Sequence, residues 1–372
     1  MNDRALLRRT AVAAAALAVT APLTLCAAGN AGAAGTSRTA VASGSAVVSG
    51  TAVVSGTAVA SGSAAASGAA ATAGAAGDSG TAVTSGAAEA AAAAIAAWSA
   101  IGHPIVFARY DATDSIEDLY GISPLGTPPV QLTHTPTVSD VMPSWSPDGK
   151  RVAFLRQSLD GAIDGIWTMN SAGGDLKLVP GTKGASDPAW SPDGTRIAYS
   201  RPVDSQREIY VADIDGTPAT RLTTTAADEF HPTWSPDGKN LAFSRTDTSG
   251  GSRLVRIQLS TLVQTPITAA GSQDWTPDWS RGNRIAFSRL DATGFAHLYV
   301  INPDGTGALP ITSAAAHDKF PSWSPDGRRL VFTRGGTDDA DPEHLFLVRA
   351  DGTGLKQLTK TASHDLEADW RP

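Results

Sequence analysis

Hydrophobic and polar positions follow a pattern of about 44 residues that recurs from residue 143 to the end of the chain. The first five units have a proline, one further residue and a tryptophan, then a polar turn and an apolar run that ends in arginine or just before it, and the last unit has Ala368 for the proline and stops after its tryptophan. The tryptophans stand 45, 44, 45, 44 and 47 residues apart. A fixed period of this length predicts one supersecondary unit used repeatedly. The six tryptophans are Trp145, Trp190, Trp234, Trp279, Trp323 and Trp370.

The unit that begins at Pro232 shows four short strands. Its Pro236–Lys239 segment predicts a tight turn, because proline presets φ, aspartate bonds its own backbone and glycine accepts positive φ. The apolar runs on either side are short and separated by polar connections, which is typical of antiparallel strands. The expected strands are Pro232–Ser235, Leu241–Arg245, Leu254–Leu259 and Val263–Thr268.

The two ends of the repeat region complement each other. The first recognisable strand, Ile105–Arg109, matches the second strand of a unit, and its two successors lie near Asp118–Ile122 and Val130–Thr133. At the other end, Glu367–Pro372 matches the missing first strand. We therefore predict an all-β fold, a six-bladed β-propeller over residues 100–372, closed by its C-terminal strand. The tryptophans are expected to pack between neighbouring blades.

The Pro-x-Trp-Ser-Pro-Asp-Gly run followed by an apolar strand resembles the repeat of the TolB-like propeller family. One unit departs from it, because Arg281-Gly282 stands where the others have Pro-Asp-Gly. The resemblance implies six blades and a protein that acts in the cell envelope with a lipoprotein partner. Low-complexity sequence stands where TolB carries an α/β domain. The matching stretches are Pro143–Phe154, Pro188–Tyr199, Pro232–Phe243 and Pro321–Phe332.

The first 33 residues predict an export signal. Three arginines precede an apolar stretch, Ala11–Leu25, that is too short and alanine-rich for a membrane span, and Ala31–Ala33 fits a small-x-small cleavage site. Cleavage after Ala33 gives a secreted or extracytoplasmic chain with no transmembrane domain and no cysteine. Leu23–Cys26 resembles a lipoprotein site, so lipid anchoring through Cys26, the only cysteine, is the alternative.

Residues 34–99 predict a linker. Eight hexads rich in alanine, serine, glycine and threonine occupy residues 43–90. Small side chains bury too little area to offset the backbone entropy lost on folding, so we expect a disordered low-complexity spacer. A small left-handed β-helix is the alternative interpretation of the hexads.

The charge of the chain argues against nucleic acid as a partner. The formal net charge is −7, from 29 basic and 36 acidic residues. Four of the basic and three of the acidic residues precede residue 100, which leaves 25 against 33 in the propeller. No basic stripe is visible, whereas nucleic-acid binding requires one. Cations, basic peptides and polar glycans are compatible with this balance.

Acidic residues recur three positions before the proline of the first strand, or before Ala368 in the last unit. Because this strand lines the central channel of a propeller, a ring of acids at one channel mouth is expected, and it predicts a ligand or partner site. His317 and His364 directly precede two of the acids, and His231 and Trp275 closely follow two others. The residues at the recurring position are Asp140, Ala185, Glu229, Asp274, Asp318 and Asp365.

A structural interpretation of the same acids is favoured over the binding site, and both can hold together. Each second strand carries an arginine near its end, and counting across the turn places Arg156 opposite Val141, beside Asp140. Bidentate arginine–carboxylate pairs would then clamp each blade. Ala185 removes the acid from one blade, so Arg201 is expected to turn to Asp187. The arginines are Arg109, Arg156, Arg201, Arg245, Arg289 and Arg334.

Candidate catalytic chemistry is sparse. The seven histidines are scattered, no nucleophile–base pair is recognisable, and the Asp-Gly turns lack the acidic ladder of a calcium loop. We therefore predict no catalytic residues, no cofactor and no metal, and an exported monomer that binds a protein or envelope component. The alternative is a metal-dependent carbohydrate-active enzyme, a lyase or lactonase, that uses the channel mouth.

Overall fold

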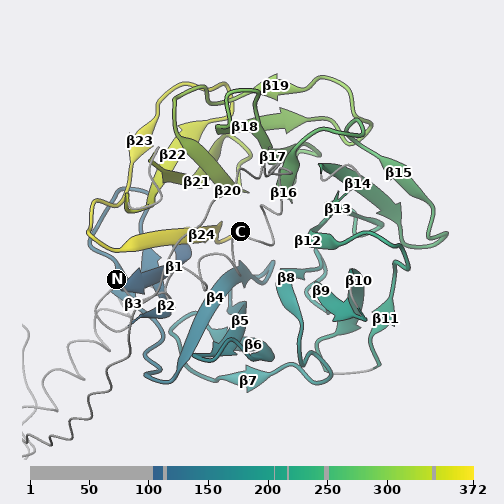
Figure 1. The fold of residues 1–372 in the computed structure, drawn as a ribbon. Helices are drawn as coiled ribbons and strands as arrows, with labels where there is room; N and C mark the ends of the chain where they lie inside the picture. Colours follow the sequence, from purple (N-terminus) through teal and green to yellow (C-terminus); the bar gives the residue numbers. More distant parts are fainter. Residues whose placement is uncertain (1–103, 112–114, 205, 216–217, 247–250, 337–340) are drawn as a thin grey trace, which may run out of the picture. The chain divides into compact units, whose positions relative to one another are not determined.

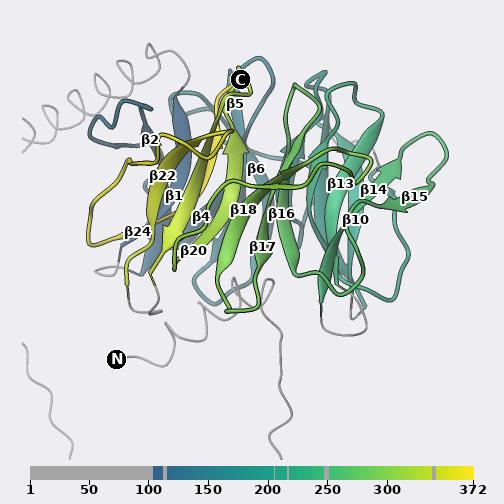
Figure 2. The same ribbon diagram turned by 90° about the horizontal axis from the view of Figure 1, so that it is seen from above.

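The computed structural model describes residues 104–372, except 112–114, 205, 216–217, 247–250 and 337–340. Within them, six four-stranded antiparallel sheets form the blades of a ring (Figure 1). Figure 2 shows the strands running side by side from one face of the ring to the other. This confirms the all-β six-bladed propeller predicted from the repeat. The predicted signal peptide, 1–33, and linker, 34–99, lie outside the described residues.

Each blade has the same order from the channel outwards, with a short outermost strand. Blade 1 is β24 (His364–Trp370), β1 (Ile105–Asp111), β2 (Ile116–Ile122) and β3 (Val130–Gln131); blade 2 is β4 (Val138–Trp145), β5 (Arg151–Ser158), β6 (Ile163–Asn170) and β7 (Lys177–Leu178); blade 3 is β8 (Ser186–Trp190), β9 (Arg196–Val203), β10 (Gln206–Asp213) and β11 (Thr220–Arg221). Blade 4 is β12 (Glu229–Trp234), β13 (Asn240–Thr246), β14 (Ser252–Gln258) and β15 (Gln264–Pro266); blade 5 is β16 (Asp274–Trp279), β17 (Ile285–Leu290), β18 (Ala296–Ile301) and β19 (Leu309–Pro310); blade 6 is β20 (His317–Trp323), β21 (Arg329–Gly335), β22 (His344–Arg349) and β23 (Lys356–Gln357).

The ring is closed by strands from opposite ends of the repeat region. β24 pairs with β1 in antiparallel register, with Ile105 opposite Trp370 and Arg109 opposite Asp365. Figure 1 shows this yellow strand beside the blue one, nearest the channel. The closing strand predicted from the leftover first strand is confirmed, and it begins at His364, three residues earlier than expected.

Six hydrophobic clusters lie between neighbouring blades, and each contains one repeat tryptophan. Trp145, for example, packs with Val106 and Leu119 of blade 1, and Trp370 packs with Val331 and Leu345 of blade 6. All six tryptophans are at most 9% exposed. The prediction that the tryptophans pack between blades is therefore confirmed. Burial of each ring stabilises one seam of the propeller by roughly 3 kcal/mol.

Every innermost strand contains a β-bulge that the sequence pattern did not reveal. In blade 2, the bulge between Val141 and Ser144 puts Asp140 directly opposite Arg156. The predicted pairing of Arg156 with Val141 was therefore wrong by one residue, because a bulge inserts an extra residue in one strand. The bulged residues have positive φ, and they are Met142 (54°), Asp187 (57°), His231 (50°), Thr276 (50°), Phe320 (53°) and Glu367 (53°).

The outer hairpin turn of blade 5 depends on a glycine that touches the preceding blade. Gly305 has φ of +86°, and a Cβ there would lie 2.5 Å from the carbonyl oxygen of Ile267. We expect Gly305→Ala to lower the free energy of unfolding by about 3 kcal/mol, from backbone strain plus the clash. Gly294→Ala, at φ of +90° with open space, should lower it by about 1 kcal/mol. Urea denaturation of both variants tests this, and equal losses would contradict the blade contact.

Candidate functional site

Buried arginine–carboxylate pairs join the first two strands of most blades. In four of them, Nε and Nη2 of the arginine each donate to a different carboxylate oxygen, over 2.6 to 3.1 Å. The carboxylates are fully buried. The sequence had brought these residues together as a possible clamp, and the geometry is that of a bidentate pair. The four pairs are Arg109–Asp365, Arg156–Asp140, Arg289–Asp274 and Arg334–Asp318.

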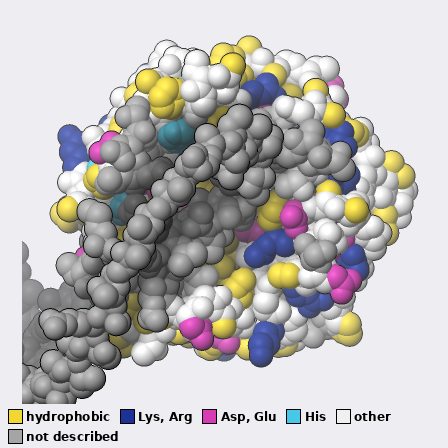
Figure 3. Space-filling view, viewed as in Figure 1, with side chains coloured by type: hydrophobic (Ala, Val, Ile, Leu, Met, Phe, Trp, Pro, Cys, Tyr) yellow, Lys and Arg dark blue, Asp and Glu magenta, His cyan; other side chains and the backbone are white. Residues whose placement is uncertain are grey.

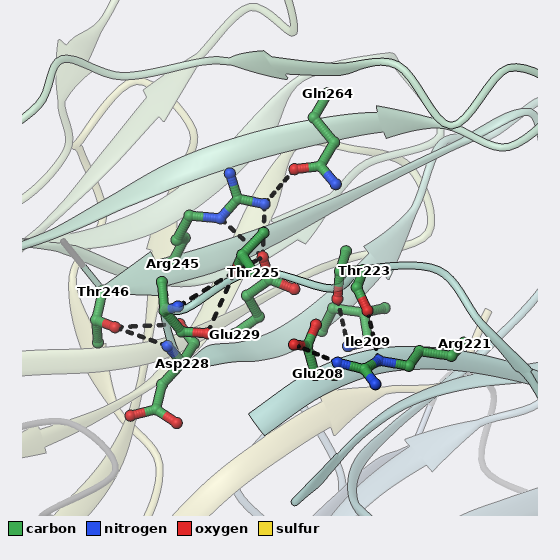
Figure 4. Close-up of polar contacts among 11 residues, drawn as sticks. Glu208, Ile209, Arg221, Thr223, Thr225, Asp228, Glu229, Arg245, Thr246 and Gln264 are labelled. Atoms are coloured by element: carbon green, nitrogen blue, oxygen red, sulfur yellow. Dashed lines mark hydrogen bonds and ion pairs between the residues drawn. The ribbon is translucent and has the colours of Figure 1, made fainter. Parts of the chain in front are cut away.

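The pair in blade 4 differs in geometry (Figure 4). Arg245 contacts a single oxygen of Glu229, through Nε at 2.8 Å and Nη2 at 2.5 Å, and it also donates to Gln264. In blade 3, Arg221 holds Glu208 at 2.8 Å in the same view. Burial raises the pKa of Glu229, although Thr223 and Arg245 counteract this, and the nearby Glu208 adds to the rise. Glu229 therefore ties blade 4 together less completely than the aspartates tie theirs.

Blade 3 has no such pair. Arg201 donates to the carbonyl oxygen of Gly181 at 3.2 Å, and its guanidinium lies 4.1 Å from the ring centre of Tyr210. The expected contact of Arg201 with Asp187 was wrong. Asp187 instead accepts hydrogen bonds from the hydroxyl groups of Ser200 and Ser186, because it lies on the bulge and points to the channel side.

The acids expected at the channel mouth do not reach the channel surface. Asp140, Glu229, Asp274, Asp318 and Asp365 have no exposed area, and an arginine bonds both oxygens of each aspartate and one oxygen of Glu229. Their neighbours are placed elsewhere. The Nδ1 atoms of His317 and His364 accept from the backbone N–H groups of Ala296 and Glu343, and Trp275 is half-buried in β16. Of the residues proposed from sequence for this site, only His231 lines the cavity described next.

The innermost strands of all six blades line a central cavity of about 150 Å³. The residue directly before the proline, or before Ala368, projects into it from each blade. These are the bulged residues, so the same local distortion positions all of them. Their place before proline is the signal that could have identified them. The first layer comprises Met142, Asp187, His231, Thr276, Phe320 and Glu367, and the second comprises Ser144, Ala189, Thr233, Asp278, Ser322 and Asp369.

Side chains of the second layer bond to the backbone of the next blade. Asp369 accepts from the N–H of Trp145 at 2.7 Å, and Asp278 accepts from the N–H of Trp323 at 2.8 Å. The hydroxyl of Thr233 accepts from the N–H of Trp279 at 3.0 Å. The layer thus forms a belt that joins neighbouring blades around the channel.

Three carboxyl groups of the channel have raised pKa values. Burial raises the pKa of Glu367 to about 8, with a smaller contribution from the negative charge of Asp187. Burial and the neighbouring Asp278 raise the pKa of Asp369 to about 7. Burial alone raises the pKa of Asp278 to about 6, against hydrogen bonds that lower it. The channel therefore holds protons near neutral pH.

Asp187 and His231 form the one close acid–histidine pair of the channel, with Oδ1 and Nε2 3.7 Å apart. Burial raises the pKa of Asp187, but His231, Arg207 and the hydroxyl of Ser200 outweigh it, so the pKa is lowered. Burial lowers the pKa of His231, and Asp187 only partly reverses this. The pair combines a charged carboxylate with an imidazole that favours its neutral form.

The raised carboxyl groups make stability depend on pH. A carboxyl whose pKa rises on folding binds its proton more tightly in the folded chain, so acidification through that pKa stabilises the fold. Between pH 8.5 and 6.5, we expect the free energy of unfolding to increase by about 2–3 kcal/mol, from Glu367 and Asp369. His231 opposes this only as the pH falls through 6.5. Urea denaturation at both pH values measures it, and the double variant Glu367→Gln/Asp369→Asn should remove most of the increase. A stability that is flat or falls over this range would contradict the assignment.

Three further observations bear on what the propeller can bind and where it can act. Among the described residues, no three His, Cys, Asp or Glu side chains are grouped so that they could hold a metal ion. On the visible part of the face in Figure 3, lysines and arginines are interspersed with acidic and uncharged side chains rather than gathered in one basic area. None of the described residues belongs to a helix with the length and hydrophobicity needed to cross a membrane.

The repeat is matched by a family model over most of the ring. The model is described as the TolB beta propeller domain, and it matches residues 126–372. The chain belongs to this TolB propeller family. No protein among curated sequences matches it.

Solved structures with the same fold include TolB proteins and an enzyme. TolB from Acinetobacter baumannii superposes with a TM-score of 0.63 at 20% identity, covering 73% of this chain and 67% of that one. A putative TolB from Agrobacterium tumefaciens gives 0.56 at 22% identity, covering 73% and 99%. Hydrazine synthase from Kuenenia stuttgartiensis gives 0.57 at 14% identity, covering 72% and 46%. At these identities the similarity establishes the fold, which is shared by proteins of different function.

Proposed function

We propose that the chain is an exported, non-enzymatic propeller that binds a protein or another envelope component at its central channel. The observation that carries this proposal is a contrast between positions in the repeat. The positions that build the blade are nearly the same in all six units, as with the tryptophans and the arginines. The position that faces the channel holds six different residues, from Met142 to Glu367. Residues that are the same in every blade suit a structural role. Different residues at the equivalent position of each blade suit recognition of an asymmetric ligand.

The backbone at the channel supports this interpretation. Non-glycine residues seldom adopt positive φ, and each such residue costs about 1 kcal/mol or more. Six of them stand at the same place in six blades, and they aim side chains such as His231 and Phe320 into one cavity. Strain of this kind concentrates at functional sites. The surrounding clamps and tryptophans hold the bulges in place.

The sequence and the family support an extracytoplasmic location. Residues 1–33 have the charge and hydrophobicity of an export signal, and residues 34–99 the composition of a spacer. The TolB relatives suggest a protein partner in the envelope. No geometric observation favours the alternative, a metal-dependent lyase or lactonase. Metal analysis of the purified chain would reveal it, because stoichiometric Mn, Ca or Zn would favour the enzyme.

The test is capture of a partner from the native envelope, with variants at the channel. A photo-crosslinking residue in place of Thr276, which lines the channel, should trap the partner, and mass spectrometry identifies it. We expect His231→Ala/Phe320→Ala to reduce its capture at least tenfold. The matched control His134→Ala/Leu309→Ala changes two exposed residues outside the channel and should capture as the parent does. Equal recovery by all baits, with unchanged melting temperatures, would refute the channel as the binding site.

A further inference from the structure

Unlike the clamp carboxylates, the channel carboxylates have no lysine or arginine beside them in the cavity lining, although the charge of Arg207 lowers the pKa of Asp187 from outside it. Each clamp carboxylate has an arginine within 3.1 Å. The described residues that line the central cavity include Asp187, Asp278, Glu367 and Asp369, but no lysine or arginine. Buried charges in proteins are normally paired, because an unpaired one is strongly destabilised by loss of hydration. Protons relieve this cost at Glu367, Asp369 and Asp278 near neutral pH, and a cation from outside the chain could take their place.

Glu367 shows most directly where such a cation would bind. The residue is only 7% exposed and lines the cavity. Its Oε2 accepts the N–H of Met142 at 2.8 Å, whereas its Oε1 has no hydrogen-bond partner in the described structure. In the next layer, Asp369 receives only neutral donors, the N–H of Trp145 and the hydroxyl of Ser322. A largely buried carboxylate that lines a cavity and accepts a neutral donor at one oxygen can accept a ligand at the other.

We propose that the channel receives one basic side chain of the binding partner, the ammonium group of a lysine or the guanidinium group of an arginine. This inference rests on the proposed function and assigns the chemistry of the group recognised. The cation would sit between the carboxylates of Glu367 and Asp187 in the first layer and those of Asp278 and Asp369 in the second.

The size and walls of the cavity fit such a group. Its volume of about 150 Å³ corresponds to about five water molecules, and the lysine side chain has five non-hydrogen atoms beyond Cα. Met142 and Phe320 line the cavity beside the acids, and they can pack against the aliphatic stem and the cation. The carboxylates are spread over two layers, and among the described residues none form a three-ligand group. This arrangement suits an elongated organic cation better than a metal ion.

Binding of a cation is coupled to release of protons. Glu367 faces Asp187, Glu117 and Glu343, whose negative charges add to burial in raising its pKa to about 8. The negative charge of Asp278 likewise adds to burial in raising the pKa of Asp369, and His231 is the remaining titratable group among the described lining residues. A carboxylate attracts a cation only after its proton has left. Affinity for the basic side chain therefore increases as the pH rises.

The experiment titrates the purified chain with three capped tripeptides, followed by NMR or calorimetry at pH 8.5 and 5.5. The probes are acetyl-Gly-Lys-Gly-amide, acetyl-Gly-Arg-Gly-amide and acetyl-Gly-norleucine-Gly-amide. We expect the lysine or arginine peptide to bind at least tenfold more tightly than the norleucine peptide at pH 8.5. Lowering the pH to 5.5 should weaken it at least tenfold, and binding at pH 7.5 should release protons.

The variants assign the binding to the channel. Glu367→Gln keeps the shape and removes the charge, so it should weaken the basic peptide at least tenfold and leave the norleucine peptide unchanged. Asp341→Asn removes the same charge from an exposed residue outside the cavity and should have no effect. Equal affinity for lysine and norleucine, or binding that Glu367→Gln does not change, would overturn the proposal. The melting temperature of each variant confirms that it is folded.

Failure of this inference can be told apart from failure of the proposed function. If crosslinking at Thr276 captures a partner that the His231→Ala/Phe320→Ala variant loses, but the basic peptides do not bind, the channel is a binding site for a different chemistry. If the basic peptides bind but no envelope partner is captured, the cation site stands without the proposed function.

Discussion

Removal of residues 363–372 will leave a chain that no longer unfolds in one cooperative transition. The deletion takes away β24, which exposes Ile105 and Phe107 on β1 and leaves the partly buried Arg109 without Asp365. Loss of the Trp370 ring costs about 3–5 kcal/mol, and an unpaired buried arginine a similar amount. Together they approach the total stability of about 5–15 kcal/mol that is usual for a folded domain.

Thermal unfolding followed by circular dichroism and calorimetry measures the effect of this deletion. A chain that lacks ten residues of the hexad tract, within 43–90, is the control of equal length change, and it should melt at the parent temperature. A separate peptide of residues 363–372, added in excess, should restore part of the transition. If the truncated chain melts at the same temperature as the parent, β24 does not close the ring.

Replacement of Asp140 by alanine should lower the free energy of unfolding by about 3–5 kcal/mol. The substitution leaves Arg156, which is only 8% exposed, without the carboxylate that it bonds across the paired strands β4 and β5 of blade 2. An unpaired buried charge is costly because the protein does not replace the lost hydration. For a propeller of this size, the expected fall in melting temperature is about 10 °C.

Two controls separate the charge from the packing at this clamp. The double variant Asp140→Leu/Arg156→Met replaces the pair by apolar side chains of similar size, and it should recover most of the loss. Arg201→Met in blade 3, where no carboxylate pairs with the arginine, should cost less than about 1 kcal/mol. If Asp140→Ala and Arg201→Met lower the free energy of unfolding equally, the Asp140 carboxylate does not stabilise blade 2 through its pairing with Arg156.

The fold was predictable because the repeat units of one chain can be aligned with each other, which reveals the positions that they share. Apolar runs such as Leu241–Arg245 recur at one spacing, and a tight turn with proline, aspartate and glycine precedes most of them, so strand order could be deduced from one unit. The tryptophans had to lie between blades, because a single four-stranded sheet cannot cover them. The missing first strand at one end and the surplus strand at the other predicted the closure. These conclusions depend only on local pattern and on the requirement to bury apolar surface.

The candidate site was predicted only in part. The arginines and acids could be paired from their spacing, but their register could not, because the extra residue at each bulge shifted Asp140 from beside Arg156 to directly opposite it. The sequence predicted that blade 3 lacks the arginine–carboxylate pair, because Ala185 stands where the other blades have an acid. The sequence did not predict the new contacts of Arg201. Asp187 faces the central cavity, whereas Arg201 donates to the carbonyl oxygen of Gly181.

The amino-acid sequence by itself determined the number of blades, the closing strand, the tryptophan seams and the acid–arginine partners. Each follows from periodicity and from the burial of apolar surface, which are properties of residue type and spacing. Only the tertiary structure decided which residues face the channel. Positive φ at residues as different as Met142 and Glu367 is imposed by packing of the neighbouring blades, not by their own side chains. That distortion brings three residues around one cavity: Asp187, which the sequence had paired with Arg201; His231, which it had placed at the channel mouth; and Glu367, to which it had given no role.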